Sequence, residues 1–313
     1  MRLVFFGSGE FGMPTLRRLA TEHDVALVVT QPDRPAGRNR TLKPTPIAEL
    51  ATRLKIAVIK PENVNDSSIV KQLRDAGARG FVVIAFGQKL GKPLLDGAFA
   101  INLHASLLPK YRGAAPINWA MINGERETGL SVITLADRMD AGDVLGQSVT
   151  TIDPHETAGE LHDRLAEMGP SLVLEVLRRF EAGHLPHRRQ DERLATHARK
   201  LTKSDGTVRF DQPALSVRNR VHGLTPWPGC TIELGGKPLR LVRVEVASEL
   251  ALVEIPGAVL ADRAIACFPG AVRLLAVQSP GGKQMSFDAY CNGHDVSPGE
   301  LCTPLHAATE DVA

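Results

Sequence analysis

The sequence predicts an α/β domain followed by a smaller all-β domain, and three observations lead to this expectation. The chain has 313 residues, enough for two domains, and its 43% hydrophobic and 23% charged residues are close to the averages for globular proteins. In the first half, short continuous apolar runs alternate with helix-like segments, a pattern typical of buried parallel strands in βαβ units. From residue 206 onward, short β-like runs punctuated by glycine and proline dominate. We therefore expect a Rossmann-like, mostly parallel sheet and then an OB-like barrel.

The expected elements of the first half alternate along the chain. Apolar runs predict strands at 3–6, 25–30, 57–59, 81–85, 100–103, 129–135 and 144–150. Segments with helical periodicity predict helices at 15–20, 47–54, 68–76 and 157–181. The last of these begins with Thr157 and Glu160, which are spaced as in a capping box. Gly169 and Pro170 lie in its interior, so we expect the helix to bend or restart there.

The second half has a different composition. Residues 184–205 are polar and basic and lack apolar periodicity, so we expect a linker that runs over the surface. Short β-like runs predict strands at 207–210, 230–234, 239–246, 258–260, 264–266 and 272–277. These patterns divide the chain into an α/β domain at 1–183, a basic linker at 184–205 and a β-barrel domain at 206–313.

The net charge of +2 conceals an uneven distribution of charge along the chain. Residues 188–243 hold 12 Lys and Arg against 5 Asp and Glu, whereas residues 244–313 hold 3 against 9. A basic stretch beside an acidic end is typical of a surface that binds a polyanion such as a nucleic acid. A basic surface that is merely solvated would give the same count.

The cysteines and the N-terminal residues bear on the cellular compartment. Four cysteines, at positions 230, 267, 291 and 302, include no C-x₂-C pair, which argues against a zinc ribbon, and we expect no metal. Only four consecutive apolar residues precede Gly7, too few for a signal peptide, and no apolar run approaches the roughly 18 residues of a membrane span. We therefore expect a cytoplasmic monomer without disulfides or a membrane segment.

A glycine-rich turn after the first strand indicates one possible cofactor. Gly7, Gly9 and Gly12 match the G-x-G-x-x-G pattern that binds a dinucleotide pyrophosphate, and Asp33 lies 21 residues further on. This pattern indicates an NAD-dependent oxidoreductase. However, Asp33 lies in a proline- and glycine-rich loop, past the strand end where a ribose-binding acid is expected. Small residues in a tight strand-to-helix turn would give the same pattern.

The densest group of reactive side chains follows the predicted strand at 100–103. Asn102 and His104 are two residues apart at the end of this strand, so both side chains point to the same face of the sheet. The carboxyl edge of a parallel sheet is where α/β folds bind their ligands. An amide donor and a titratable imidazole aimed at one atom suit the transfer of a carbonyl group.

A carboxylate partner for His104 is expected from the loop at 137–143. This loop carries Asp137, Asp140 and Asp143, and any of them could hold the imidazole in one tautomer. Ser106 lacks the context of a nucleophile, and the cysteines lie in the second domain. The sequence therefore favours direct attack by the substrate's own amine over a covalent enzyme intermediate.

Together these motifs resemble the folate-dependent formyltransferase superfamily. The resemblance rests on Asn102, the run at 104–109 and the Asp-Ala-Gly-Asp sequence at 140–143. Further segments are similar to the members that formylate methionyl initiator tRNA: QPDRPAGR at 31–38, RGAAP at 112–116, and KLTKSDG at 200–206, which leads to PWPG at 226–229. The family usually has Gly-Thr-Pro at the first turn, where this chain has Gly-Ser-Gly. The resemblance extends from about residue 2 to about residue 300.

The resemblance implies a reaction and a set of site residues. A formyl group would pass from 10-formyltetrahydrofolate to the α-amine of methionyl initiator tRNA. The implied catalytic residues are Asn102, His104 and Asp140. The implied folate-binding residues are Ser106, Leu107, Leu108 and Pro109, with Phe86, Gly87 and Gln88 lining the pterin pocket. The implied tRNA contacts are the second domain and Arg34, Arg38, Arg40 and Lys43, in a loop that resembles the family's insertion against the acceptor stem.

Three other functions stay open at this point. An amino-sugar nucleotide N-formyltransferase would share the catalytic residues, although the basic loop and the KLTKSDG segment argue against it. An NAD-dependent oxidoreductase would use the glycine-rich turn. A non-catalytic tRNA-binding module would use the basic stretch alone.

Overall fold

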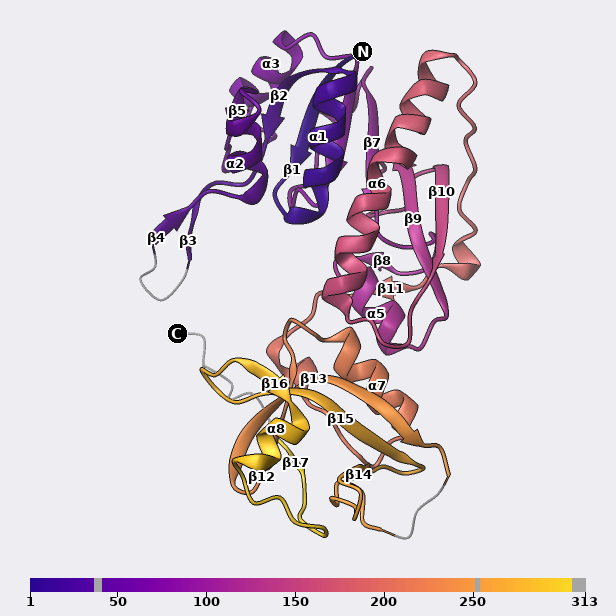
Figure 1. The fold of residues 1–313 in the computed structure, drawn as a ribbon. Coiled ribbons are helices and arrows are strands. Elements are labelled where there is room, and N and C mark those ends of the chain that lie inside the picture. The colour runs from indigo at the N-terminus through magenta and orange to yellow at the C-terminus, as the bar shows by residue number, and fades with distance from the viewer. Residues whose placement is uncertain (37–40, 251–253, 306–313) are drawn as a thin grey trace. The chain divides into compact units, whose positions relative to one another are not determined.

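The structure is a computed structural model that describes residues 1–36, 41–250 and 254–305 (Figure 1). The chain forms two compact units that are interleaved along the sequence. The first unit consists of Met1–Arg112, Gly129–Thr150 and His162–Thr196, and the second of Gly113–Thr128, Thr151–Leu161 and His197–Ala313. The predicted domain limits at residues 183 and 206 stay predictions.

A seven-stranded sheet is the framework of the first unit (Figure 1). In order across the sheet, the strands are β10 (Val144–Thr151), β9 (Glu127–Thr134), β7 (Phe99–His104), β6 (Gly80–Ile84), β1 (Arg2–Gly7), β2 (Asp24–Val29) and β5 (Val58–Ile59). The pairing is parallel from β5 through β2, β1 and β6 to β7, whereas β7 and β9 are antiparallel. This confirms the predicted mostly parallel sheet. The strand order reverses between β1 and β6, and a ligand crevice is expected outside the carboxyl ends of strands at such a point.

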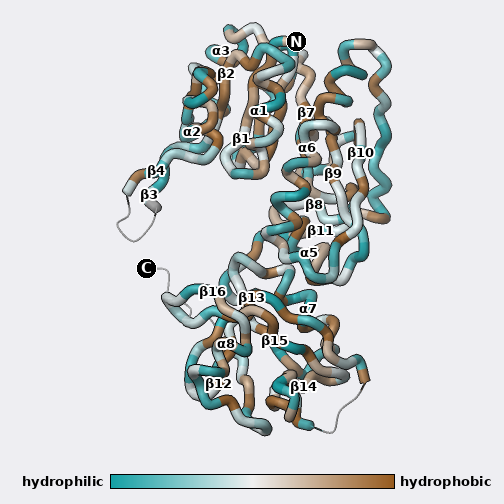
Figure 2. Tube along the Cα trace, viewed as in Figure 1, coloured by the Kyte–Doolittle hydropathy of each residue, from teal (hydrophilic) through white to brown (hydrophobic). Residues whose placement is uncertain are grey.

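Apolar side chains on both faces of the sheet hold the first unit together. Every residue of β6 is buried, and in β1 only Arg2 is exposed. Phe6 contacts Phe81 and Phe86 edge to face, with ring centroids 5.3 and 5.5 Å apart. The helices that accompany the sheet are α1 (Met13–Glu22), α2 (Pro46–Arg53), α3 (Ser67–Asp75), α4 (Lys92–Leu95) and α6 (Ala158–Glu181). Figure 2 shows apolar residues along β1, as expected for a strand buried on both faces.

The long helix α6 confirms one prediction and contradicts another. At its start, Glu160 Oε2 accepts from the backbone N–H of Thr157 at 2.7 Å, and Thr157 Oγ1 accepts from the N–H of Glu160 at 3.4 Å, so the capping box is confirmed. The helix runs without interruption through Pro170, so the restart is wrong, and the predicted bend stays a prediction. A Cβ atom at Gly169 would lie 2.8 Å from Leu103 Cδ2. This close packing against β7 keeps the helix continuous despite the missing N–H of proline.

The second unit is built on an antiparallel sheet, which confirms the predicted β domain. Its strands, in order, are β14 (Ile265–Ala266), β15 (Ala271–Gln278), β13 (Lys237–Ser248), β12 (Cys230–Leu234) and β17 (Thr303–Pro304), with β16 (Gln284–Ser286) beside β15. The described part of this unit also contains α5 (Pro116–Ile122), α7 (Ala214–Gly223) and α8 (Phe287–Asn292), which the sequence analysis did not predict. Val217 and Val221 of α7 and Phe287 of α8 enter the same core as Ile232 and Leu241 of the sheet.

Two of the strands predicted for the second half do not form. Residues 203–206 are the 3₁₀ helix η3 (Lys203–Gly206), and residues 207–210 are not in a strand. Val208 and Phe210 are buried in the core, so the alternating pattern reflects burial without strand pairing. The backbone oxygen of Thr207 accepts from Arg220 Nε at 2.6 Å. The stretch at 258–260 contributes isolated bridges rather than a strand.

The segment at 184–205, which was predicted to run over the surface, is mostly exposed but is bonded to the first unit's sheet. The backbones of Arg188 and Val144 exchange two hydrogen bonds, of 2.9 and 3.0 Å, so the segment lies beside β10. Gln190 is 7% exposed and Ala198 is fully buried. The sequence did not indicate these contacts, because Gln190 is polar and Ala198 is small, and such buried groups leave no apolar periodicity.

Two small two-stranded sheets complete the described fold. They are β3 (Arg34–Ala36) with β4 (Thr41–Lys43), and β8 (Arg112–Gly113) with β11 (His197–Ala198). The first is a hairpin within the basic loop that was predicted to contact tRNA. Arg38 and Arg40 of that loop lie outside the described residues.

Candidate active site

Strand β7 brings Asn102 and His104 to the carboxyl edge of the sheet. Asn102 pairs with Val83 of β6 on one side and with Ile133 of β9 on the other. Because the two residues are two apart on one strand, their side chains lie on the same face. Asn102 is partly exposed, and within the described residues no hydrogen bond occupies its carboxamide. That N–H group can therefore donate to a ligand.

His104 is nearly buried and is held from two sides. Its Nε2 lies 2.9 Å from the backbone oxygen of Tyr111, and its Nδ1 lies 3.6 Å from Asp140 Oδ2. The side chain of His104 is 7% exposed and that of Asp140 is 12% exposed. Because a carbonyl oxygen can only accept, Nε2 carries the proton that bonds to Tyr111. Nδ1 faces the carboxylate of Asp140, so a proton on Nδ1 would lie beside that group.

Of the three acids in the loop after β9, Asp140 is the one that faces His104. Asp143 instead lies 3.5 Å from His187 Nδ1, and Asp137 is exposed. Asp140 has a φ of +53°, a left-handed conformation that is unfavourable for a residue with a Cβ atom. The geometry thus selects one of the three acids that the residues alone left open, and it is the acid that the family resemblance implied.

The run predicted to bind folate, at 106–109, is a loop fixed from its buried side. Ser106 is fully buried, and its hydroxyl donates at 2.6 Å to a backbone oxygen of the same loop. Ser131 Oγ accepts from the N–H of Leu108 at 3.0 Å and donates to the oxygen of Ser106 at 2.7 Å. Leu108 is buried, whereas Leu107 and Pro109 are partly exposed. Ser106 and Leu108 therefore shape the loop, and Leu107 and Pro109 are its members on the surface.

The run predicted to line the pterin pocket follows β6 at the same edge of the sheet. Phe86 is buried in the core, and Gly87 is exposed with a φ of +87°, which favours glycine. The carboxamide of Gln88 accepts from the N–H of Val64 at 2.8 Å and donates to the backbone oxygen of Pro61 at 3.0 Å. Gln88 therefore ties the loop before α3 to the sheet edge, beside the exposed backbone of Gly87.

The glycine-rich turn after β1 is occupied by the protein's own groups. Ser8 Oγ donates to a backbone oxygen just beyond β6 at 3.2 Å and accepts from the N–H of Gln31 at 3.1 Å. A Cβ atom at Gly7 would lie 2.8 Å from a backbone oxygen of β6, so this position requires glycine for packing. Asp33 forms an ion pair of 2.7 Å with Lys60. These contacts give Gly7, Ser8 and Asp33 structural roles that need no dinucleotide.

The described part of the predicted tRNA loop presents two cations. Arg34 and Lys43 lie opposite each other in the register of the β3–β4 hairpin, and both are exposed. The guanidinium of Arg34 lies 3.7 Å from Glu62. The contributions of Arg38 and Arg40 stay predictions, since these residues lie outside the described part of the chain.

Arg112, Gln190 and Glu192 form a hydrogen-bonded group beside the loop at 137–143. None of the three was predicted as a site residue. Arg112, 2% exposed, donates to Gln190 Oε1 from Nε at 3.0 Å and from Nη2 at 2.8 Å. Gln190 Nε2 donates to the backbone oxygens of Asp140 and Gly142, both at 2.7 Å. Hydrogen bonds from Arg112, and then from a second arginine, lower the pKa of Glu192 to about 2. The RGAAP motif could have indicated a role for Arg112. No pattern in the polar stretch around Gln190 could have indicated a role for Gln190.

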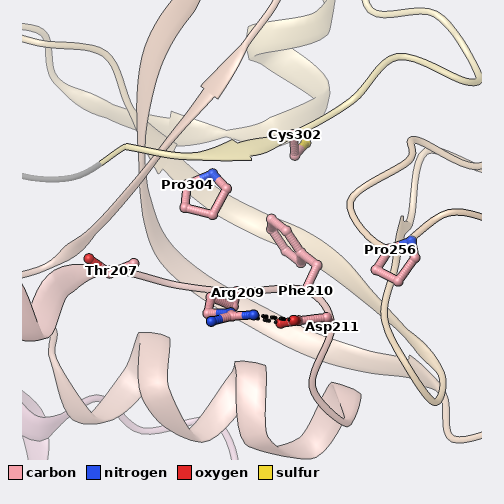
Figure 3. Close-up of a pocket in the computed structure, with 7 residues that line it drawn as sticks. All are labelled: Thr207, Arg209, Phe210, Asp211, Pro256, Cys302 and Pro304. Atoms are coloured by element: carbon pink, nitrogen blue, oxygen red, sulfur yellow. Dashed lines mark hydrogen bonds and ion pairs between the residues drawn. The ribbon is translucent and has the colours of Figure 1, made fainter.

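A hollow of about 370 Å³ in the second unit is less suited to catalysis than the sheet edge of the first unit (Figure 3). It is lined by Thr207, Arg209, Phe210, Asp211, Pro256, Cys302 and Pro304. Arg209 and Asp211 bond to each other, as the dashed lines in Figure 3 show. Burial raises the pKa of the Cys302 thiol to about 12, so the thiol is protonated and a poor nucleophile. The sheet edge of the first unit therefore remains the candidate active site.

No group of three or more His, Cys, Asp or Glu side chains in the described ranges is placed to hold a metal ion. No helix in that part of the chain is both long and apolar enough to cross a bilayer.

Comparison with known proteins identifies relatives of both halves of the chain. The family described as formyl transferase matches residues 1–177, and the family described as formyl transferase, C-terminal domain, matches residues 200–295. A methionyl-tRNA formyltransferase from Heliobacterium modesticaldum is 43% identical over 314 residues, which cover 96% of this chain and 99% of that protein. A methionyl-tRNA formyltransferase from Caldanaerobacter subterraneus subsp. tengcongensis is 39% identical over 308 residues, which cover 96% of this chain and 99% of that protein.

Solved structures of low sequence identity share the fold. WlaRD, a sugar 3N-formyl transferase, matches with a TM-score of 0.66 and 14% identity, over 87% of this chain and 96% of that one. HypX from Aquifex aeolicus matches with a TM-score of 0.60 and 20% identity, over 93% of this chain and 47% of that one. The fold alone does not identify the substrate, since a sugar formyl transferase shares it. The identity of about 40% over nearly the full length of the two relatives above is more specific than the shared fold. This chain belongs to the methionyl-tRNA formyltransferase family.

Proposed function

We propose that this protein transfers the formyl group of 10-formyltetrahydrofolate to the α-amine of the methionine carried by initiator tRNA. One observation carries the proposal: Asn102 lies on the same face of β7 as His104, at the carboxyl edge of the sheet, and His104 faces Asp140. An amide donor beside a pair that can hold a proton meets the needs of carbonyl transfer between two nitrogen atoms. Family membership supplies the identity of the two substrates.

Asn102 stabilises the charge that develops on the formyl oxygen. The neutral amine attacks the formyl carbon, a new C–N bond forms, and the carbonyl oxygen becomes negative in a tetrahedral intermediate. The N–H of Asn102 donates to that oxygen, because no protein group occupies it within the described residues. A donor placed in advance costs no reorganisation when the charge appears.

The His104–Asp140 pair moves one proton. The attacking nitrogen must lose a proton, and N10 of the folate must gain one when its bond to the formyl carbon breaks. Asp140 Oδ2 and His104 Nδ1, 3.6 Å apart, are the positions that hold the proton between these events. The backbone oxygen of Tyr111 holds Nε2, so the ring keeps its orientation while Nδ1 changes protonation. The pair returns to its starting state when the proton reaches N10.

The folate is assigned to the two loops that flank these residues. The partly exposed Leu107 and Pro109 and the exposed backbone of Gly87 offer apolar and hydrogen-bonding surface for it. The buried Ser106, Leu108 and Phe86, together with the bonded Gln88, support those loops from within.

The tRNA is assigned to the β3–β4 hairpin and to exposed cations, most of which lie in the second unit. Among the 12 Lys and Arg at 188–243, Arg193, Arg199, Arg209 and Arg243 each bind a carboxylate. Arg189, Lys200 and Lys237 are exposed, and within the described residues they have no such partner. Cations without a carboxylate can displace counterions from phosphates, so we expect affinity for tRNA to fall steeply with salt. That the protein acts as a cytoplasmic monomer stays a prediction.

Formyl transfer in vitro tests the proposal. The purified protein is incubated with 10-formyltetrahydrofolate and methionyl initiator tRNA, and the formylated product is separated on an acidic gel. We expect product only when both substrates are present. An amino-sugar nucleotide as acceptor tests the amino-sugar alternative, and absorbance at 340 nm with NADH tests the oxidoreductase. Formylation of the sugar but not of the tRNA, or binding of tRNA without product, would refute the proposal.

A further inference from the structure

We propose that Gln190 is a positioning residue for formyl transfer, and that the segment at 188–196 fixes both partners of His104. The inference rests on the proposed function, because it concerns how the His104–Asp140 pair is held. This segment resembles a linker in composition, yet it hydrogen-bonds on both sides of the imidazole. One group of bonds holds the loop that carries Asp140, and the other holds the backbone around Tyr111.

The carboxamide of Gln190 clamps the acidic loop. Its Nε2 donates to the backbone oxygens of Asp140 and Gly142, both at 2.7 Å, and the side chain is 7% exposed. Asp140 has a φ of +53°, a conformation that persists when the surrounding structure holds it. The two hydrogen bonds provide that hold, and they set the direction in which the carboxylate points toward His104.

Arg112 gives the Gln190 side chain a single orientation. Nε and Nη2 of Arg112 donate to Gln190 Oε1 at 3.0 and 2.8 Å. A guanidinium has donors only, so a flipped amide would place its NH₂ group against other donors and its oxygen against two backbone oxygens. Arg112 is in turn held by Glu192, through two hydrogen bonds of 3.0 and 3.1 Å. The amide nitrogen of Gln190 must therefore face the acidic loop.

Thr196, at the other end of the segment, holds the second partner of His104. Its Oγ1 accepts from the N–H of Tyr111 at 2.8 Å, and its backbone oxygen accepts from the N–H of Arg112 at 2.9 Å. Tyr111 also has a left-handed backbone, with a φ of +61°. The oxygen of Tyr111, which binds His104 Nε2 at 2.9 Å, is thus placed by the same segment that places Asp140.

This arrangement predicts a change in rate without a change in binding. Gln190 is buried and acts on the reaction through the backbones of Asp140 and Gly142, so its loss misplaces the Asp140 carboxylate. Misplacement of a reacting group by about 1 Å can cost roughly 100-fold in rate. We therefore expect kcat to fall, while KM for the folate and for the tRNA changes little.

Two substitutions distinguish the acceptor role of the Gln190 carboxamide from its donor role. Gln190→Glu keeps an acceptor for Arg112 and removes both donors to the acidic loop, whereas Gln190→Met removes all of the bonds. We expect kcat to fall roughly 10- to 100-fold in both variants, with each KM within about twofold of the wild-type value. If Gln190→Glu folds and retains the wild-type kcat, the clamp has no role in the reaction.

A double-mutant cycle tests whether Gln190 acts through Asp140. In an Asp140→Asn background, Gln190→Glu should lower kcat by less than about threefold, because the group that it positions is already gone. A full additional loss would overturn the proposal in favour of a general structural role. Gln278→Met is the matched control, since it removes a glutamine-to-backbone bond of 2.9 Å in the second unit and should leave kcat within about twofold.

The result distinguishes this inference from the proposed function. A wild-type protein that forms no formylated tRNA refutes the proposed function. An active wild-type protein with a fully active Gln190→Glu variant refutes the positioning role alone.

Discussion

The polar side chains around His104 in the first unit and the surface charges of the second unit differ in burial and in hydrogen bonding. In the first unit, His104, Arg112 and Gln190 are each less than 10% exposed and have fixed hydrogen-bond partners. In the second unit, charged side chains such as Arg209 lie at the surface and pair with neighbours in the sequence, here Asp211. Buried, bonded groups define geometry, whereas exposed charges attract a polyanion without fixing one position. It follows that rate and affinity should respond to different substitutions.

The largest expected effect is that of Asn102→Ala on the rate. Loss of one donor to a developing oxyanion typically costs about 10²–10³ in kcat. Affinity for tRNA should stay within about twofold, because the carboxamide contributes to the reaction rather than to the charged surface. Single-turnover formylation measures the first quantity, and fluorescence anisotropy measures the second. The exposed Asn292 of α8 supplies a control, since Asn292→Ala should change neither. A turnover near the wild-type value in Asn102→Ala would remove Asn102 from the mechanism.

The next largest expected effect is a loss of unfolding free energy in Arg112→Met. This substitution removes the donors to Gln190 and Glu192 from a buried position, and breaking a buried charged network typically costs about 3 kcal/mol or more of unfolding free energy. The pKa of Glu192 should also rise from about 2 toward its ordinary value of 4.5. Urea unfolding, followed by far-UV circular dichroism, measures the loss.

Arg138→Met is the matched control for this measurement. Arg138 binds the same Glu192 but is 69% exposed, so its loss should cost less than about 1 kcal/mol. Equal losses in the two variants would show that burial does not distinguish the first unit in the way described above.

The sequence predicted the fold where burial leaves a periodic pattern. The apolar runs of β1 and β6 marked the parallel sheet, and the strand predicted at 230–234 has the bounds of β12. The helices α7 and α8 were missed because they are short and lie among β-like runs punctuated by glycine and proline. In α7 the buried Ala214, Val217 and Val221 do carry helical spacing, so a signal was present.

The site residues also divide into those that a regular pattern in the sequence predicts and those that it does not. Asn102 and His104 could be predicted because a spacing of two on a strand places them on one face. Selecting Asp140 from three acids needed the structure, since loop geometry decides which carboxylate meets His104. Gln190 could not be found from the residues, because its partners are about 50 and 80 positions away and a buried polar side chain looks like a solvated one in a sequence.

An effect of intermediate size is expected on the pH dependence of stability, through His222 in the core of the second unit. This side chain is 2% exposed, and burial, followed by the charges of Arg218 and Arg243, lowers its pKa from 6.5 to about 4. The unfolded chain therefore binds a proton more readily between these values, so stability is lost as the pH falls below 6.5. We expect a loss of about 2 kcal/mol between pH 7.5 and pH 5.

The variant His222→Gln should remove most of that pH dependence. Glutamine can accept from the N–H of Val244, as His222 Nε2 does at 3.1 Å, but it carries no titrating group in this range. Urea unfolding at the two pH values gives the slope, and the exposed His197, changed to Gln, gives the reference. An unchanged slope in His222→Gln would assign the pH sensitivity to the carboxylates instead.

The smallest expected effect is on tRNA affinity. It tests whether the exposed charges contribute only by attracting the tRNA. Lys200 is exposed and has no carboxylate partner within the described residues, whereas Arg209 is held by Asp211 at 2.5 Å. Lys200→Ala should raise the Kd by a few fold and lower the slope of log Kd against log salt by about 1, without changing kcat. Arg209→Ala should leave both quantities near their wild-type values, because that guanidinium is already neutralised by its neighbour. Anisotropy titrations from 50 to 200 mM salt measure the slope, and equal slopes in the two variants would mean that ion pairing within the protein does not decide which cations meet the tRNA.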